Sequence, residues 1–486
     1  MAFNKRRLTG LILGPVLFAA LLLLPLPTGM SPQGMKVAAV AVLMATFWIT
    51  EAIAIPATAL IPIALFPLLA VMPTAKVTAA YANHLIYLFL GGFLLAASIE
   101  KWQLHKRIAL HTIQLVGVTP KRIILGFMLA TAFLSAWISN TATAMLMMTI
   151  GLAVLRQTYS GTEQDSGEIP ASSFGTALML GIAYAASIGG VATLIGTPPN
   201  AILAGIAEKN FGYTIGFAQW MMFGLPLSVV MLSLTWYYLT RFIMGKTNIE
   251  LPGGRRAIRQ QLKALGPMSP QEKKVLAVFV FVAVAWIFRG LVEIDYLKNV
   301  TDSSIAIFAA LLLFMIPADW QKGEFLLDWS TAVRIPWDII VLFGGGFALA
   351  SGFESSGLTQ WIAAELVVLQ GAGLVMTVLA VVLIVIFLTE VTSNTATASL
   401  VVPVIGAFAL AVQIHPLYLM VAVAIAASFA FMLPVATPPN AIVFSTRQIS
   451  IAQMAKAGIW LNLCGSLIIT ACVVLLIPWV FPVVAK

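Results

Sequence analysis

The sequence predicts an all-α polytopic membrane protein: two inverted repeats of five crossings plus a re-entrant hairpin each, after one extra N-terminal helix. Of its 486 residues, 60% are hydrophobic and only 9% are charged, whereas soluble domains carry about 25% charged residues. Apolar runs long enough to span a bilayer recur from end to end. Three short words also occur twice in the same order. This composition excludes an ordinary soluble protein, and despite the net charge of +9 we expect no nucleic-acid partner.

The apolar segments give the expected helices in order. About 20 helical residues cover the roughly 30 Å hydrocarbon core. Three segments (122–156, 173–209 and 373–412) are too long for one simple crossing and carry polar residues near their middle, and 416–446 is interrupted in the same way. We expect 122–156 and 373–412 to be re-entrant hairpins and the others to be eleven full crossings. The remaining spans are 10–28, 36–52, 54–72, 84–100, 217–243, 274–291, 303–317, 338–354 and 455–483.

The basic residues test this arrangement, because cytoplasmic loops carry an excess of Lys and Arg. With two hairpins, 21 of the 27 Lys and Arg residues fall on the side of the N-terminus and six on the other. We therefore expect a multi-pass protein of the plasma (inner) membrane with its N-terminus in the cytoplasm. This distribution of basic residues requires each long segment to return the chain to the side from which it entered. A re-entrant hairpin does so, and two full crossings would do so equally.

The repeated words divide the chain into two halves. Leu88–Phe93 resembles Leu342–Phe347, and both are followed 51 residues later by Ser-Asn-Thr-Ala-Thr-Ala, at Ser139 and at Ser393. The word Thr-Pro-Pro-Asn-Ala-Ile follows in each half, 58 and 44 residues further on. The extra 14 residues of the first half fall in the polar insert Gln157–Ser173.

An odd number of crossings per repeat makes the second copy enter the membrane from the opposite side, which is the plan of many secondary transporters. We expect an N-terminal extra helix at 1–35, a first repeat at 36–246, a polar cytoplasmic linker at 247–273 and a second repeat at 274–486. A duplication kept only for folding is the alternative.

Each double proline predicts a broken helix inside the membrane. Pro198 and Pro199 lack N–H groups and free the carbonyls of Leu194 and Ile195, and Pro438 and Pro439 repeat this break. Irregular backbone at membrane depth must line a cavity or meet a partner. A cation suits free carbonyls, and the N-terminus of the next half-helix, expected near Asn200, suits an anion. A kink that only shapes packing is the alternative.

The Ser-Asn-Thr triplets lie near the middle of the two hairpin segments. Their hydroxyl and amide groups can donate to a carboxylate and offer oxygens to a cation. Polar contact between helices is the alternative. No Lys or Arg occurs from Ile335 to Thr446 or from Ile123 to Leu155. An anion bound by these triplets therefore needs helix N-termini and bound cations to neutralise it, with sodium binding first.

Two further features are interpreted as structural. Glu390 precedes the second triplet, where the first half has Ala136, and we interpret it as a paired structural acid. The glycines at 91–92 and 344–346 lie inside spans without a following Lys-Ser/Thr, which favours close helix packing over phosphate binding. The sequence shows neither a nucleophile–base pair nor a metal-ligand cluster, which argues against an enzyme.

The two Ser-Asn-Thr words, the two Thr-Pro words and the glycine-rich Leu-Phe helices resemble the divalent anion–sodium symporter (INDY-type, sodium/dicarboxylate) family over nearly the whole chain. The resemblance implies a homodimer in which a transport domain moves like an elevator against a scaffold. It also implies one site for sodium and substrate, and no cofactor besides the coupling ions.

The resemblance assigns two sets of residues. The substrate-binding set is Ser139, Asn140, Thr141, Thr197, Pro198, Ser393, Asn394, Thr395, Thr437 and Pro438. The first sodium site would use Ser135, Ser139, Asn140 and Gly196, and the second Thr389, Thr392, Asn394 and Ala436, several of them through backbone carbonyls. The intact triplets resemble those of carriers of succinate, malate and fumarate. A sodium-independent di- or tricarboxylate exchanger and a carrier of citrate or sulfate are the alternatives, and a channel is a further rival.

Overall fold

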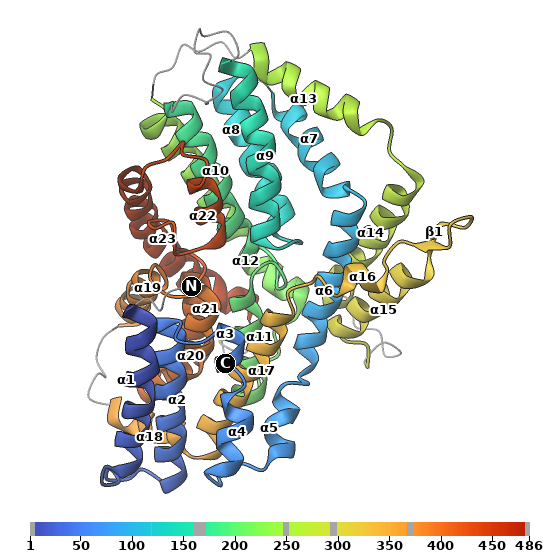
Figure 1. The fold of residues 1–486 in the computed structure, drawn as a ribbon. Helices are drawn as coiled ribbons and strands as arrows, with labels where there is room; N and C mark the ends of the chain where they lie inside the picture. Colours follow the sequence, from blue (N-terminus) through green and yellow to red (C-terminus); the bar gives the residue numbers. More distant parts are fainter. Residues whose placement is uncertain are drawn as a thin grey trace.

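The computed structural model describes residues 5–117, 119–159, 172–245, 252–291, 299–366 and 373–481. These residues are overwhelmingly helical, as predicted (Figure 1). Among the described residues the one strand pair is a short antiparallel hairpin of β1 (Pro317–Asp319) and β2 (Glu324–Phe325). Eight described helices are long and apolar enough to cross a membrane. The fold is therefore that of a multi-pass helical membrane protein.

The first half follows the N-terminal helix α1 (Lys5–Leu23). It contains a long first helix, three short helices, a glycine-rich helix, an oblique helix, a hairpin, a broken helix and a closing helix. In this order they are α2 (Pro32–Thr50), α3 (Ile55–Thr58) with α4 (Ile61–Leu68) and α5 (Thr74–Ala80), α6 (His84–Lys101), α7 (Leu104–Val116), α8 (Pro120–Ser135) with α9 (Asn140–Tyr159), α10 (Ser173–Gly190) with α11 (Pro198–Phe211), and α12 (Phe217–Tyr238) extended by the π-helical η1 (Leu239–Ile243).

The second half repeats this order after α13 (Pro252–Leu265). Its elements are α14 (Pro270–Leu291), α15 (Asp302–Met315), α16 (Trp329–Ala332), α17 (Trp337–Ser355), α18 (Leu358–Leu366), α19 (Leu374–Thr389) with α20 (Asn394–Ala411), α21 (Pro416–Ala426) with α22 (Pro438–Phe444), and α23 (Ile451–Val480). Both triplets lie where two helices of one hairpin meet, and both double prolines begin a new half-helix.

Several sequence expectations need correction. The segment 54–72 is not one helix but α3 and α4, because Pro56 and Pro62 each begin a new helix, with proline at its favoured N-terminal position. Helix α11 begins at Pro198, near Asn200 as expected, again with proline at the helix N-terminus. The predicted linker 247–273 contains α13 and the first turn of α14, and Ala257 and Ile258 are buried where α13 packs on α7 and α9. Helices α5, α7 and α18 were not expected. The insert Gln157–Ser173 lies largely outside the described residues.

The core forms where the two halves interlock. Every residue of α10 after Ser173 is buried, and α10 packs on α8, α9, α12 and α22. In the other half, α21 packs on α11, α19, α20 and α23. The returning arm of each hairpin also packs on the half-helix of the other half, α9 on α22 and α20 on α11. The hairpins and broken helices therefore form one continuous packed unit.

The glycine-rich helices pack closely, as predicted. A β-carbon on Gly91 of α6 would lie 2.6 Å from the backbone of Ala306, and one on Gly345 of α17 would lie 2.5 Å from the carbonyl oxygen of Ala59. These distances are shorter than real β-carbon contacts. Any larger residue at either position would therefore force the helices apart.

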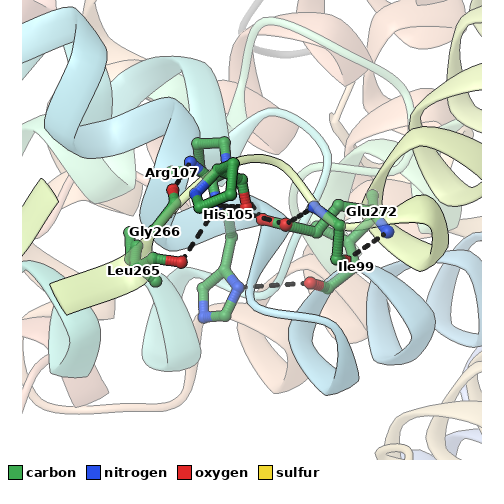
Figure 2. A network of polar contacts seen from close by, with 8 residues as sticks. Ile99, His105, Arg107, Leu265, Gly266 and Glu272 are labelled. Atoms are coloured by element: carbon green, nitrogen blue, oxygen red, sulfur yellow. Dashed lines mark hydrogen bonds and ion pairs between the residues drawn. The ribbon is translucent and has the colours of Figure 1, made fainter. Parts of the chain in front are cut away.

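The oblique helices α7 and α18 are anchored differently. Arg107 on α7 donates to both carboxylate oxygens of Glu272 on α14, at 2.7 and 3.1 Å, and its guanidinium also donates to the carbonyls of Leu265, Gly266 and Pro267 (Figure 2). This ion pair is buried. On α18, the indole of Trp361 donates to Thr28 O at 3.1 Å. Each oblique helix thus holds the segment that precedes the first long helix of the opposite half.

That contact exposes a repeat that the sequence analysis missed. The word Met-Ser-Pro-Gln begins at Met30 before α2 and at Met268 before α14. Both serines cap their helix: Ser31 Oγ accepts from Gly34 N, and Ser269 Oγ accepts from Glu272 N. Serine followed by proline is a typical helix start. An internal comparison of helix starts would have found this word.

Candidate functional site

At the first hairpin tip, a hydroxyl lies between two oxygens. Ser135, the last residue of α8, donates from Oγ to Ala186 O at 2.7 Å and contacts Asn140 Oδ1 at hydrogen-bond distance. Asn140 begins α9 beyond the polar turn. A β-carbon on Gly190 would lie 2.7 Å from Asn140 Oδ1 and 3.1 Å from Gly196 O. Ser135, Asn140 and Gly196 therefore meet at the point where α10 ends, and only glycine fits between them.

The second tip repeats this geometry. Thr389, the last residue of α19, places Oγ1 2.8 Å from Asn394 Oδ1 and 3.0 Å from Ala427 O. Thr392 Oγ1 lies 2.7 Å from Thr397 Oγ1 and donates to Leu388 O at 2.8 Å. Among the described residues no hydrogen bond joins Ala436 to this cluster. The structure thus brings together Thr389 and Asn394, with Thr392 one turn away.

A buried asparagine braces each broken helix. Asn200 Nδ2 donates to Thr193 O at 2.8 Å and to Gly190 O at 3.4 Å. Asn440 Nδ2 donates to Leu433 O and Ala430 O, both at 3.0 Å. Both asparagines are fully buried, and neither Oδ1 has a partner in the described part of the chain. The sequence analysis read these asparagines only as members of the repeated word and missed their role as braces.

The breaks leave backbone carbonyls free, as predicted. No donor within the described residues reaches the carbonyl oxygens of Leu194 and Ile195. Thr197 and Thr437 have extended backbone immediately before α11 and α22, but only the Thr437 side chain accepts a hydrogen bond, from Asn440 N at 3.3 Å. Free carbonyls inside a membrane protein need a ligand or water. The first break therefore presents unused acceptors next to the N-terminus of α11.

The triplet hydroxyls also lack protein partners. The side chains of Ser139, Thr141, Ser393 and Thr395 are partly buried and make no hydrogen bond within the described ranges. Buried polar groups are normally hydrogen-bonded. These four hydroxyls are thus available as donors or acceptors for a bound solute. The nearby Pro198 and Pro438 are partly buried and exposed, respectively.

Glu390 is a structural acid, as interpreted from the sequence. Its Oε1 accepts from Phe431 N at 2.7 Å, Met432 N at 2.9 Å and Asn462 Nδ2 at 2.7 Å, while Oε2 accepts from Leu433 N at 3.1 Å. The carboxyl group is 3% exposed. It therefore joins the end of α19, the break after α21, and α23, and both of its oxygens accept hydrogen bonds from the protein.

The donor set suits a hard cation. At each tip one hydroxyl oxygen lies close to both an amide oxygen and a backbone carbonyl oxygen. The hydroxyl group has one hydrogen, which can be donated to only one of these two acceptors. The other oxygen–oxygen contact therefore has no proton between its atoms. Hard cations prefer such oxygen ligands. In the described residues no group of three or more His, Cys, Asp or Glu side chains is placed to hold a metal. Both tips therefore offer uncharged oxygen ligands and no carboxylate or imidazole cluster in the described part of the chain.

Comparison with known sequences defines the class of protein and then the family. The chain aligns along nearly its whole length with membrane transporters. One is the sodium-dependent dicarboxylate transporter SdcS of Staphylococcus saprophyticus, 46% identical over 98% of this chain and 92% of the relative. Another is SdcS of Staphylococcus aureus (strain USA300), 45% identical over 99% of this chain and 92% of the relative.

The family model for the sodium:sulfate symporter transmembrane region matches residues 5–483. The chain belongs to this family and is a membrane transporter, which confirms the resemblance seen in its repeated words.

Two solved structures share the fold at low sequence identity. The YdaH transporter of Alcanivorax borkumensis matches with a TM-score of 0.55 and 13% identity, over 84% of this chain and 88% of that chain. MtrF of Neisseria gonorrhoeae, described among antimetabolite efflux pumps, matches with a TM-score of 0.58 and 12% identity, over 97% of this chain and 95% of that chain. Both are transporters, and the similarity concerns the arrangement of helices alone.

Proposed function

We propose that this protein is a sodium-coupled symporter of four-carbon dicarboxylates such as succinate, malate and fumarate. The observation that carries the proposal is the pair of matched tips, each with an oxygen cluster for a cation beside unpartnered hydroxyls for an anion. The relatives' names support sodium dependence and dicarboxylates. The family description mentions sulfate, so a sulfate carrier remains the second candidate.

The substrate carboxylates would contact the triplet residues, with the backbone at Thr197, Pro198, Thr437 and Pro438 alongside. Ser135, Ser139, Asn140 and Gly196 would hold one sodium ion, and Thr389, Thr392, Asn394 and Ala436 the other. The stretches 123–155 and 335–446 contain no Lys or Arg, so a bound dianion is neutralised by the sodium ions and the helix N-termini. Sodium and substrate therefore stabilise each other's binding, and this mutual dependence couples their transport.

The same elements support an elevator-type motion between two inverted repeats. Hairpins and broken helices from both halves pack together, as in α9 with α22 and α20 with α11. This unit would move as the transport domain of each protomer in a homodimer, against a scaffold formed by α2, α6, α14, α15 and α17. The repeats would occupy residues 36–246 and 274–486 of a plasma-membrane protein, with the N-terminus in the cytoplasm.

Uptake into proteoliposomes tests the proposal. Purified protein is given labelled succinate under an inward sodium gradient, with potassium in its place, and with unlabelled succinate inside. Symport predicts accumulation only with sodium, whereas exchange without sodium would identify the alternative. A panel of malate, fumarate, citrate and sulfate sets the substrate class. Absence of mutual enhancement between sodium and every one of these anions would refute the proposal.

A further inference from the structure

A cavity lies away from the hairpin tips. It has a volume of about 820 Å³ and opens between the start of α10, the end of α12 with η1, and the first turns of α23. The described lining residues are Ser172, Ser173, Thr176, Tyr238, Phe242, Ile243, Gln453, Lys456, Trp460 and Cys464. None of them belongs to the residues assigned above to sodium or substrate. The cavity therefore needs an occupant of its own.

The lining changes from polar to apolar along the helices. On α23, Gln453, Lys456, Trp460 and Cys464 are spaced by three or four residues and so share one face. The residues at the start of α10 and α23 are polar, and the lining one to three turns further in is Trp460, Cys464 and Tyr238. Trp460 is 55% exposed, and Phe242 of η1 is 66% exposed. Such a gradient, with tryptophan between a polar end and an apolar end, is typical of a membrane–water interface.

The charge at the polar end has one sign. Lys456 is the one charged residue among the described lining residues, and it forms no ion pair in the described part of the chain. Lysine near a membrane surface attracts anionic lipid headgroups. Lys456, near the start of α23, and Arg241, in η1, also fall on the side predicted to be cytoplasmic, where anionic lipids are concentrated.

We propose that this cavity binds an anionic phospholipid, with Lys456 contacting the headgroup and with Trp460, Cys464 and Tyr238 against the upper acyl chains. A soluble anion would gain nothing from the apolar wall, and a zwitterionic lipid would gain little from a lysine that has no ion-pair partner among the described residues. The bound lipid joins α10, α12 and α23, which all lie in the unit around the broken helices. The inference stands whether or not the transported solute is a dicarboxylate.

Tryptophan quenching tests the site. The full-length protein is reconstituted in phosphatidylcholine vesicles containing increasing fractions of brominated phosphatidylglycerol. The chain has 12 tryptophans, so the signal is the difference between the wild type and Trp460→Phe. We expect Trp460 to be quenched at a low fraction of phosphatidylglycerol, and Lys456→Gln to raise the half-quenching fraction about fivefold. Arg334→Gln removes an exposed charge from the same predicted side, outside the cavity, and should leave it unchanged.

A second variant tests the space in the cavity separately from the charge of Lys456. Cys464→Phe keeps Lys456 but fills the inner end of the cavity, and it should lower the number of phosphatidylglycerol molecules retained in native mass spectra. Equal quenching by brominated phosphatidylcholine, or an unchanged midpoint in Lys456→Gln, overturns the proposal. Displacement of the quenching lipid by millimolar inorganic phosphate would indicate a site for a soluble anion instead, which also overturns it.

Discussion

The two broken helices carry the same word but are held by different chemistry. At the end of α10, Trp220 Nε1 donates to Val191 O and Ser228 Oγ to Ile188 O, both at 2.9 Å, while the hydroxyl of Thr193 within the break donates to Ala136 O. After α21, Tyr184 Oη donates to Phe431 O at 2.9 Å, but the carboxylate of Glu390 also accepts from the amides of residues 431–433. The first break is thus held by neutral hydrogen bonds and the second by a buried carboxylate.

This difference separates binding groups from supporting groups. The asparagines at the proposed ligand sites match in both halves, Asn140 with Asn394, and so do the asparagines that brace the breaks, Asn200 with Asn440. The residues behind them differ, with Ala136 in the place of Glu390. A duplicated site therefore keeps its binding chemistry while each half stabilises its break by its own means. The predictions below test how far the two halves are equivalent, from the largest expected effect to the smallest.

The largest effect is expected at the tips. Asn140→Ala and Asn394→Ala each remove an amide oxygen from an oxygen cluster. An interaction of this kind with a charged partner contributes about 1.5–3 kcal/mol, or about 10- to 100-fold in sodium affinity. Sodium-dependent uptake should be lost in both variants, while size-exclusion chromatography shows a folded protein. The exposed Thr149→Ala on α9 is the control. Normal uptake in both asparagine variants would disprove the site assignment, and loss in only one would show unequal tips.

The supports should differ in their effect on stability. Glu390→Ala leaves three backbone amides and Asn462 without their acceptor, and we expect about 3 kcal/mol of destabilisation. Ser228→Ala removes one neutral hydrogen bond from the first break and should cost about 1 kcal/mol. Thermal unfolding in detergent measures both. Asn462→Ala combined with Glu390→Ala should be less than additive, since the two side chains are bonded. A Glu390→Ala protein as stable as the wild type would contradict the assigned role.

The braces should behave alike. Asn200→Ala and Asn440→Ala each remove two hydrogen bonds to backbone carbonyls next to a tip, about 2 kcal/mol at the net value of about 1 kcal/mol per bond. We expect both to raise the sodium concentration for half-maximal uptake about tenfold, with a smaller change in maximal rate. Sodium titration of uptake checks this. A change confined to one variant would show that the symmetry of the braces is structural and not functional.

The sequence predicted the membrane class, the hairpin turns and the two breaks because these depend on local chemistry. Long apolar segments, double prolines and the Ser-Asn-Thr words each determine the structure of the residues in and directly beside them. Glu390 was interpreted as structural, but its partners could not be predicted, and the contacts of Arg107 with Glu272 and of Trp361 with Thr28 were missed, because all of these join distant segments. Helix α13 was missed because its segment was interpreted as a polar linker, although Ala257, Ile258, Leu262 and Leu265 recur at helical spacing.

The smallest effect concerns the anchors of the oblique helices. Trp361→Phe keeps the ring but loses the single hydrogen bond to Thr28 O, about 1 kcal/mol. The amides of Met30 and Gly34 lie in the turn between Thr28 and the start of α2, and they should exchange with deuterium about fivefold faster. The matching segment at Gly266 and Ser269, held by the buried Arg107–Glu272 pair, should be unchanged, because distant sites act independently. Faster exchange at both segments would mean that the two anchors act as one unit and that the halves are coupled through their oblique helices.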